Sequence, residues 1–364
     1  MSKTLQSKIL KALFIILTLY LFLLSIKLLG HSFKLFGKGF AETMIQMTSN
    51  PFAGLIIGIV ATSLIQSSST TTSIVVGLVA GGVLSLYNAI PIIMGANIGT
   101  TITNTLVSFG HINNRVEFRK AFSASIVHDF FNVCSVIVLF PLELHFHFIA
   151  KTAFILEKGF AGAGGMQMFN PLKYILDPVI KLIDHAISSI PHNSIFLMIL
   201  SLVLLFLALT LLTKTIRSLV LNKLELIINN YLFKNDVLAF ILGILLTSIV
   251  QSSSVTTSLI IPLAGAGLVN IRQIFPYTLG ANIGTTVTAI LASMATQNPI
   301  AVTVAFSHLC FNIFGIAIFY PLRFIPIRLA EFVGDKASLS KANLASFITI
   351  YILLHFIPIA FIVF

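Results

Sequence analysis

The stretch Gln66–Ser73, Gln-Ser-Ser-Ser-Thr-Thr-Thr-Ser, places eight consecutive polar residues inside apolar sequence, and it returns as Gln251–Ser258. Seven of the eight positions are identical, at an offset of 185 residues. Hydrocarbon offers no partner for a hydroxyl or an amide, so such a run is costly in a membrane unless the fold uses it. We therefore expect the chain to be organised around these two segments.

The composition is that of a membrane protein. Of the 364 residues, 57% are hydrophobic and only 9% are charged, whereas soluble domains carry about a quarter charged residues. The net charge of +11 does not indicate a nucleic-acid partner, because the basic residues lie in short loops between apolar runs, a pattern that sets membrane orientation. Cys134 and Cys310 both lie in apolar segments, which predicts buried free thiols rather than a disulfide.

Membrane blocks and loops divide the chain into six regions. Residues 51–109 contain no Asp, Glu, Lys or Arg, and their Gly and Pro residues favour broken or re-entrant helices. Ile195–Leu212 is a clear span, followed by a basic loop at Lys214–Lys223. The regions are an N-terminal helix and interfacial segment (1–50), a first repeat (51–142), an extracytoplasmic connection (143–194), a linking transmembrane helix with its basic loop (195–235), a second repeat (236–328) and a C-terminal helix (329–364).

Charge in the loops predicts the orientation. Loops 110–120, 214–223 and 323–341 are net positive, whereas the middle region carries no net charge. The positive-inside rule places these loops in the cytoplasm and the middle region outside. We expect a multi-pass protein of the cell (inner) membrane with both termini in the cytoplasm.

A second motif repeats with the first. Gly95–Thr101, Gly-Ala-Asn-Ile-Gly-Thr-Thr, returns unchanged as Gly280–Thr286, again at offset 185, and the His128-x-x-Phe-Asn pattern returns at His308. Two long halves in a membrane chain are typical of secondary transporters, with the site between the halves near the midplane. The sequence leaves parallel repeats open, but broken segments favour inverted ones. We predict an all-α polytopic membrane protein of two inverted structural repeats, each with a re-entrant helical hairpin and a broken transmembrane helix.

The motifs indicate an anion held together with cations. A Gln-Ser-Ser-Ser tip between two helical arms offers backbone N–H groups, hydroxyl donors and a helix dipole to an anion. The same oxygens, with the Gly-Ala-Asn-Ile-Gly-Thr-Thr backbone, suit a hard cation. The first membrane block contains no Lys or Arg, so no fixed cation is expected at the site. Co-bound cations would neutralise the anion, which favours cation-coupled symport over a basic anion pore.

Other interpretations of the same residues are weaker. The hydroxyl clusters could join helices without binding anything. His128 or His308 could activate a serine in an intramembrane serine hydrolase, but a nucleophile should be unique and every feature here is duplicated, so we do not expect an enzyme. The His-x-x-Phe-Asn pattern is better explained by polar bridging behind the site. Asp129, the only acid within Ala121–Phe140, is either functional or a structural acid paired with His128.

The two Gln-Ser-Ser-Ser motifs, the two Gly-Ala-Asn-Ile-Gly-Thr-Thr motifs and Val127–Asn132 resemble the type II sodium-dependent phosphate cotransporters, over about Gly54–Leu142 and Leu238–Arg328. The resemblance implies a sodium-coupled symporter of inorganic phosphate that works by alternating access in a lipid bilayer, with Na⁺ as coupling ion and no cofactor. The short ends and the cysteine-free outer loop resemble a bacterial member. A membrane phosphate sensor or scaffold without transport is the alternative, and the sequence does not separate phosphate from arsenate.

Carried over to this sequence, the resemblance implies two sets of site residues. Electrogenic members carry Asp at the position of Asp129, which implies an extra sodium ion, whereas Ser123 and Ser125 resemble the electroneutral type. The sodium-to-phosphate stoichiometry and the oligomeric state therefore stay open. The phosphate contacts implied are Gln66, Ser67, Ser68, Ser69, Ser252, Ser253 and Ser254; the sodium ligands implied are Gln251, Asn97, Thr100, Asn282, Thr285, Asp129 and Ser125.

Overall fold

The structure, a computed structural model, describes residues 3–100, 102–165, 170–187, 190, 193–231 and 235–356. All of its regular elements are helical, with no strand in the described residues, which confirms the expected all-α fold. In chain order they are α1 (Lys3–Leu35), α2 (Lys38–Met47), α3 (Pro51–Ile65), α4 (Ser68–Ala80), α5 (Leu86–Gly99), α6 (Ile102–Ser108), the 3₁₀ helix η1 (Phe109–His111), α7 (Arg115–Phe146), α8 (Phe148–Gly162), α10 (Asn170–Ile187), α11 (Asn193–Tyr231), α12 (Asp236–Val250), α13 (Ser253–Ser258), α14 (Ile261–Gly265), α15 (Ile271–Thr296), α16 (Pro299–Phe319), α17 (Phe324–Leu339) and α18 (Lys341–Phe356).

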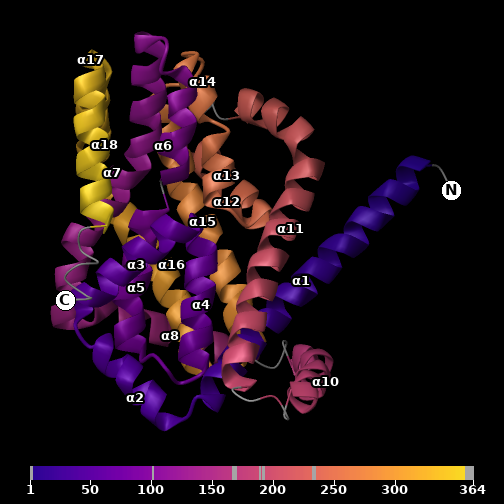
Figure 1. Cartoon of the computed structure of the whole chain (residues 1–364). Helices are drawn as coiled ribbons and strands as arrows, with labels where there is room; N and C mark the ends of the chain where they lie inside the picture. The colour runs from indigo at the N-terminus through magenta and orange to yellow at the C-terminus, as the bar shows by residue number, and fades with distance from the viewer. Residues whose placement is uncertain are drawn as a thin grey trace.

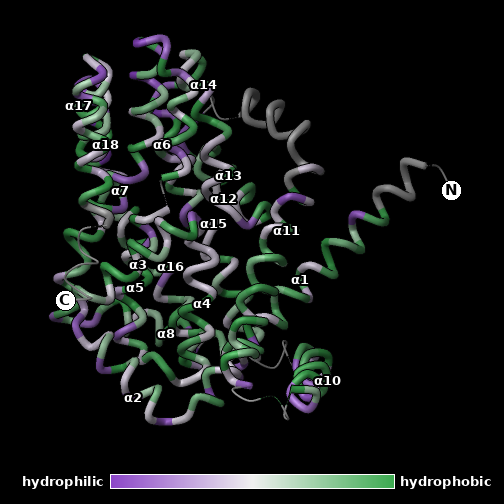
Figure 2. The backbone as a smooth tube through the Cα atoms, viewed as in Figure 1, coloured by the Kyte–Doolittle hydropathy of each residue, from purple (hydrophilic) through white to green (hydrophobic). Residues whose placement is uncertain are grey.

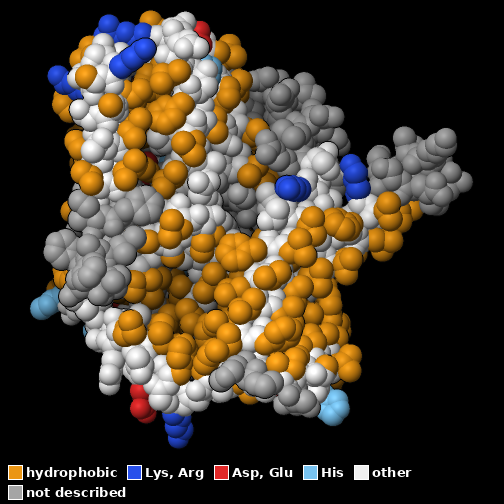
Figure 3. Space-filling view, in the orientation of Figure 1, with side chains coloured by type: hydrophobic (Ala, Val, Ile, Leu, Met, Phe, Trp, Pro, Cys, Tyr) orange, Lys and Arg blue, Asp and Glu red, His pale blue; other side chains and the backbone are white. Residues whose placement is uncertain are grey.

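Several of these helices suit a bilayer. Within the described residues, six helical segments are long and apolar enough to cross a membrane, and α2 with α3, bent by 95°, would make a seventh. Apolar residues colour most of the helical core in Figure 2, and they cover much of the face formed by α1 and α11 in Figure 3. Lys and Arg side chains gather at the end of the molecule that bears α17, uppermost in Figure 3.

Each Gln-Ser-Ser-Ser motif forms the tip of a helical hairpin. Gln66 ends α3 and Gln251 ends α12, both in the left-handed conformation with φ of 57° and 59°, which is uncommon for a residue other than glycine. The serine that follows each glutamine is extended, and its hydroxyl caps the next helix, α4 or α13. One threonine pair closes each hairpin: Thr62 and Thr71 at 3.0 Å, and Thr247 and Thr256 at 2.7 Å, between their Oγ1 atoms.

The two hairpins enter the molecule from opposite ends. In Figure 1, α3 rises from the α2 end to the centre and α4 returns to that end, whereas α12 comes down from the α14 end and α13 leads back to it. The tips meet at the centre, where the hydroxyl of Ser69 donates to the carbonyl oxygen of Gln251 at 3.4 Å. Segments 182 residues apart in the sequence are thus in direct contact.

Glycine lets a second helix pack closely on each hairpin. A Cβ atom on Gly58 of α3 would lie 1.9 Å from the carbonyl oxygen of Ile92 in α5, and one on Gly243 of α12 would lie 2.2 Å from that of Tyr277 in α15. The matching geometry explains why glycine occurs at the same place in both halves: the helix backbones approach too closely for any side chain.

We expect Gly58→Ala to destabilise the protein by about 1–3 kcal/mol, because the new methyl group overlaps the backbone of α5 and one helix must move. The measurement is the fraction of detergent-purified protein that stays monodisperse in size-exclusion chromatography after heating. Gly39→Ala is the matched control, since a Cβ there has nothing within 4 Å. This packing would be contradicted if the two variants lost half of their monodisperse protein at the same temperature.

The second half departs from the expected broken helix. In the first half α5 ends at Gly99 and α6 begins at Ile102, and Thr101 between them lies outside the described residues, so the break expected there stays a prediction. The equivalent α15, however, runs without interruption from Ile271 to Thr296, so the prediction of a break is wrong there. Gly280 and Gly284 serve close packing on α12 instead, with Cβ positions 2.0 Å and 2.7 Å from backbone oxygens of that helix.

Candidate functional site

A cavity of about 310 Å³ lies where the hairpin tips meet, and we call it the tip cavity. Its walls come from both halves and from α11, the helix that links them. The side chains are mostly hydroxyl, amide and apolar groups. The lining residues are Ile65, Ser67, Ser69, Thr70, Phe206, Leu209, Thr210, Thr213, Lys214, Gln251, Ser252 and Val255.

The structure brings together part of the expected phosphate set. Ser67 and Ser69 from the first tip and Ser252 from the second line the tip cavity. Ser67 and Ser252 also cap their helices, with Ser67 accepting from the backbone N–H of Thr70 at 3.2 Å. The cavity therefore faces the first turns of α4 and α13, where backbone N–H groups and the helix dipole favour an anion.

The remaining predicted phosphate contacts lie outside the lining. Ser68 and Ser253 are buried, 4% and 3% exposed, at the starts of α4 and α13. Ser254 turns to the opposite half and donates to the carbonyl oxygen of Thr100 at 3.3 Å. Gln66 is exposed. Among these tip residues, the structure thus groups the capping serines and Ser69 most closely around the cavity.

The two tip glutamines differ in their surroundings. Gln251 lines the tip cavity, and its amide donates to the carbonyl oxygen of Ser248 and accepts from the hydroxyl of Thr288 at 2.6 Å. Gln66, its counterpart, makes no side-chain hydrogen bond to a described residue. The second tip is therefore the more firmly held of the two.

A network of amides and imidazoles joins the halves behind the tips. The Nε2 atoms of His128 and His308 donate to the side-chain oxygens of Asn282 and Asn97 at 2.5 Å and 3.3 Å. Asn132 connects them, since it donates to the carbonyl oxygen of Asn97 at 2.7 Å and accepts from the amide of Asn282 at 2.9 Å. This geometry confirms the expected bridging role of the His-x-x-Phe-Asn pattern, and it engages the oxygens of both predicted sodium-binding asparagines.

The other predicted sodium ligands keep local hydrogen bonds. The hydroxyls of Thr100, Thr285 and Ser125 each donate to a carbonyl oxygen of their own helix, at 2.8–2.9 Å. Their oxygens keep a lone pair for a cation. Asp129 is 8% exposed. The hydroxyl of Tyr351 in α18 donates to one of its oxygens at 3.5 Å, and the other oxygen is buried without a partner in the described residues.

The contacts of the two histidines concern two other interpretations, a structural acid paired with His128 and an intramembrane serine hydrolase. Asp129 does not pair with His128 in the described residues: Nε2 of that ring is bonded to Asn282, and both its Nδ1 atom and Oδ1 of Asp129 lack a partner. The Nδ1 atoms of His128 and His308 have no partner in the described part of the chain, and their Nε2 atoms contact amides rather than serines. The Ser–base contact that a hydrolase requires is therefore not formed by either ring.

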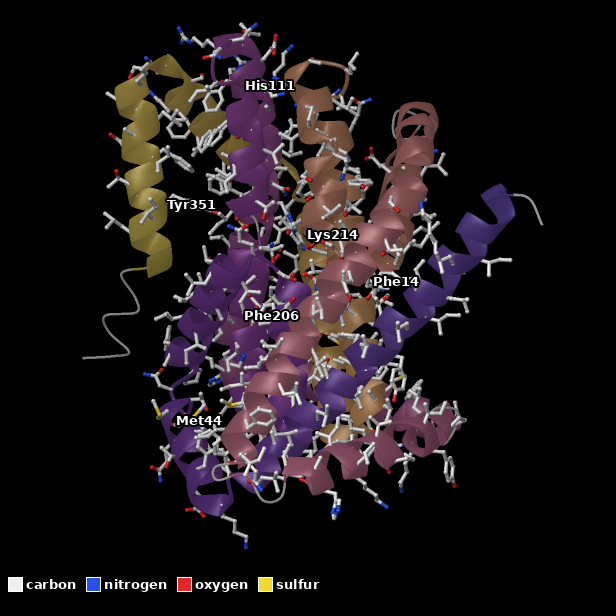
Figure 4. The ribbon with its side chains drawn as sticks, turned by 45° about the vertical axis from the view of Figure 1, so that its right-hand side comes forward. Phe14, Met44, His111, Phe206, Lys214 and Tyr351 are labelled. Carbon is white, nitrogen blue, oxygen red and sulfur yellow. The ribbon has the colours of Figure 1, made fainter. Side chains whose placement is uncertain are left out.

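One expectation about Lys214 is wrong. The sequence places Lys214 in a basic loop after the span Ile195–Leu212. The helix α11 instead continues unbroken through this position to Tyr231, and Lys214 lines the tip cavity. Figure 4 looks onto α11, with Phe206 and Lys214 labelled along it. The apolar run ends at Leu212, but the helix does not. Lysine forms a helix about as well as leucine, and threonine continues one at moderate cost.

Comparison with known proteins identifies relatives over nearly the whole chain. The sequence profile described as Na⁺/Pi-cotransporter matches residues 21–156 and 204–323. Sodium-dependent phosphate transport protein 2A of Rattus norvegicus is 34% identical over 435 residues, covering 98% of this chain and 68% of the relative. Protein 2B of Homo sapiens is 32% identical over 442 residues, covering 95% of this chain and 64% of the relative. No solved structure matches the chain significantly.

Proposed function

The chain belongs to the Na⁺/Pi-cotransporter family, a family of transporters and not of enzymes, and from this premise we propose that it is a sodium-coupled symporter of inorganic phosphate. The phosphate site of this proposal is the tip cavity. Sodium is the coupling ion and is cargo rather than a resident cofactor. The relatives named sodium-dependent phosphate transport proteins support both ions.

One observation carries the location of the site: the tips of the two hairpins, one from each half, line the same cavity. Capping serines and Ser69 offer hydroxyl donors there, and two helices begin beside them. An oxyanion needs several donors converging on one place, which two opposed tips provide and a single tip does not.

Alternating access is the mechanism we propose, with the halves acting as inverted repeats. The opposite directions of the hairpins in Figure 1 and the matching glycine contacts support this symmetry. Ser69 and Gln251 join the tips by one hydrogen bond of 3.4 Å. Ser254 and the histidine–asparagine bonds also join the halves, so in this mechanism one half moves against the other by exchanging these bonds while the core of each half stays intact.

The orientation we propose has the basic end of the molecule in the cytoplasm of the cell membrane. Arg115, Arg119 and Lys120 begin α7 at this end, and α17 adds Arg328 and Lys336. The positive-inside rule supports this side for both. The N-terminus is cytoplasmic in this arrangement, and the same expectation for the C-terminus falls on residues 357–364, outside the described residues.

We expect purified protein in proteoliposomes to accumulate ³²P-labelled phosphate when an inward sodium gradient is imposed. An equal gradient of potassium should give only background uptake, because the coupling ion is absent. The measurement is initial uptake under both gradients, with protein-free liposomes as control. Equal uptake with sodium and potassium would contradict sodium coupling, and sodium-dependent phosphate binding without any flux would favour a sensor or scaffold.

A further inference from the structure

One face of α11 lines the tip cavity, although the proposed phosphate contacts all come from the two hairpin tips. Phe206, Thr210, Thr213 and Lys214 follow the spacing of one helix face, and all four line the tip cavity. Threonine in an apolar helix usually donates to a carbonyl oxygen one turn earlier, as Thr215 does at 2.7 Å. Neither Thr210 nor Thr213 makes such a bond to a described residue, so their hydroxyls are free for an occupant of the cavity.

Lys214 is the charged member of this face. It is exposed, no described side chain pairs with it, and every other residue lining the tip cavity is uncharged. A lysine near the end of a membrane span ordinarily extends its ammonium group to the lipid headgroups. Here, instead, the side chain lines the cavity that also holds Ser69 and Ser252.

We propose that Lys214 of α11 is an anion-capture residue of the tip cavity, which sets the affinity for phosphate by attracting its negative charge and is not itself a coupling element. Two serine-rich tips donate hydrogen bonds but carry no net charge. A neutral donor set distinguishes an oxyanion from a neutral solute only weakly, whereas a fixed ammonium group favours the anion directly. The threonine hydroxyls on the same face add donors beside it.

The position of α11 gives this residue a particular role in the cycle. The helix connects the two halves and belongs to neither hairpin. A charge on it stays beside the cavity whichever tip moves, so it can hold the anion near the site before both tips close on it. This inference rests on the proposed function, since it assigns a residue to the phosphate site of that symporter.

The test compares Lys214→Gln with Lys214→Arg and Lys11→Gln in the proteoliposome uptake assay. Lys11 lies on the neighbouring α1, contacts Ser218 at 3.5 Å and does not line the tip cavity, so Lys11→Gln makes the same change in net charge elsewhere. We expect Lys214→Gln to raise the KM for phosphate about tenfold, with the maximal rate and the sodium dependence close to wild type. Lys214→Arg and Lys11→Gln should keep a KM within about twofold of wild type.

Each other outcome overturns the inference in a recognisable way. An unchanged KM in Lys214→Gln would leave the symporter intact and remove Lys214 from the site. An equal rise in Lys11→Gln would assign the effect to the general field of the protein. Loss of maximal rate at unchanged KM would indicate a structural role for Lys214. Absence of sodium-driven uptake by the wild-type protein would overturn the proposed function and this inference together.

Discussion

Ser69→Ala reduces the apparent affinity for phosphate about 10- to 100-fold, the effect of losing one hydrogen bond to a charged ligand. This result is expected because Ser69 is the buried serine that both lines the tip cavity and touches the opposite tip, through the carbonyl oxygen of Gln251. Alanine removes the hydroxyl without adding volume. The measurement is the concentration dependence of sodium-driven ³²P-phosphate uptake.

The control for Ser69→Ala lies one turn further along the same helix. Ser73 is fully buried in α4, does not line the tip cavity, and its hydroxyl has no partner among the described residues. Ser73→Ala should therefore leave both folding and phosphate affinity close to wild type. If Ser69→Ala and Ser73→Ala behave alike, Ser69 is a packing residue and the tip cavity is not the phosphate site.

The second large effect concerns Asp129, whose replacement by asparagine should abolish the phosphate-induced current while leaving phosphate uptake measurable. A buried carboxylate with one oxygen beside Tyr351 and the other without a described partner is costly to maintain, and a sodium ion would compensate its charge. Asp129→Asn keeps the shape but not the charge. Without this counter-charge the extra sodium ion does not bind. The remaining complex of phosphate and sodium then carries no net charge across the membrane.

Current and uptake should be measured on the same preparation, with Glu143→Gln as control. Glu143 is a second buried acid of α7, but its oxygens accept from the backbone N–H groups of Ile149 and Ala150, at 2.7 Å and 3.3 Å. Its role is to hold the start of α8, so its replacement should lower stability without separating current from uptake. A phosphate-induced current that persists in Asp129→Asn would remove Asp129 from charge coupling.

The hairpin tips were predictable from the sequence for a physical reason. A run such as Gln66–Ser73 is not stable on a lipid-facing helix, and its copy at Gln251–Ser258 indicates one function divided between two places. The capping roles of Ser67 and Ser252, which the structure shows, depend only on neighbouring residues of the same runs. The bridging role of His128 and its counterpart was likewise readable from the repeat.

The rest of the site depends on contacts that the sequence does not encode locally. Tyr351 contacts Asp129 although the two are 222 residues apart in the sequence, and no motif in the C-terminal helix predicts this contact. Lys214 looks like the first residue of a loop, because the apolar run stops before it. Only the continuation of α11 along the cavity gives the residue its place. The unbroken α15 was missed because glycine can break a helix or permit close packing, and the neighbouring helix decides which.

The central claim is that both tips build one phosphate site, and the number of phosphate ions bound per chain tests it most directly. Equilibrium binding of ³²P-phosphate to purified protein in sodium should give one ion per chain, and Ser69→Ala and Ser252→Ala, one in each tip, should each shift the whole binding curve to about 10- to 100-fold higher phosphate. Two ions per chain, with each variant losing only one, would contradict a shared site and assign a separate site to each hairpin.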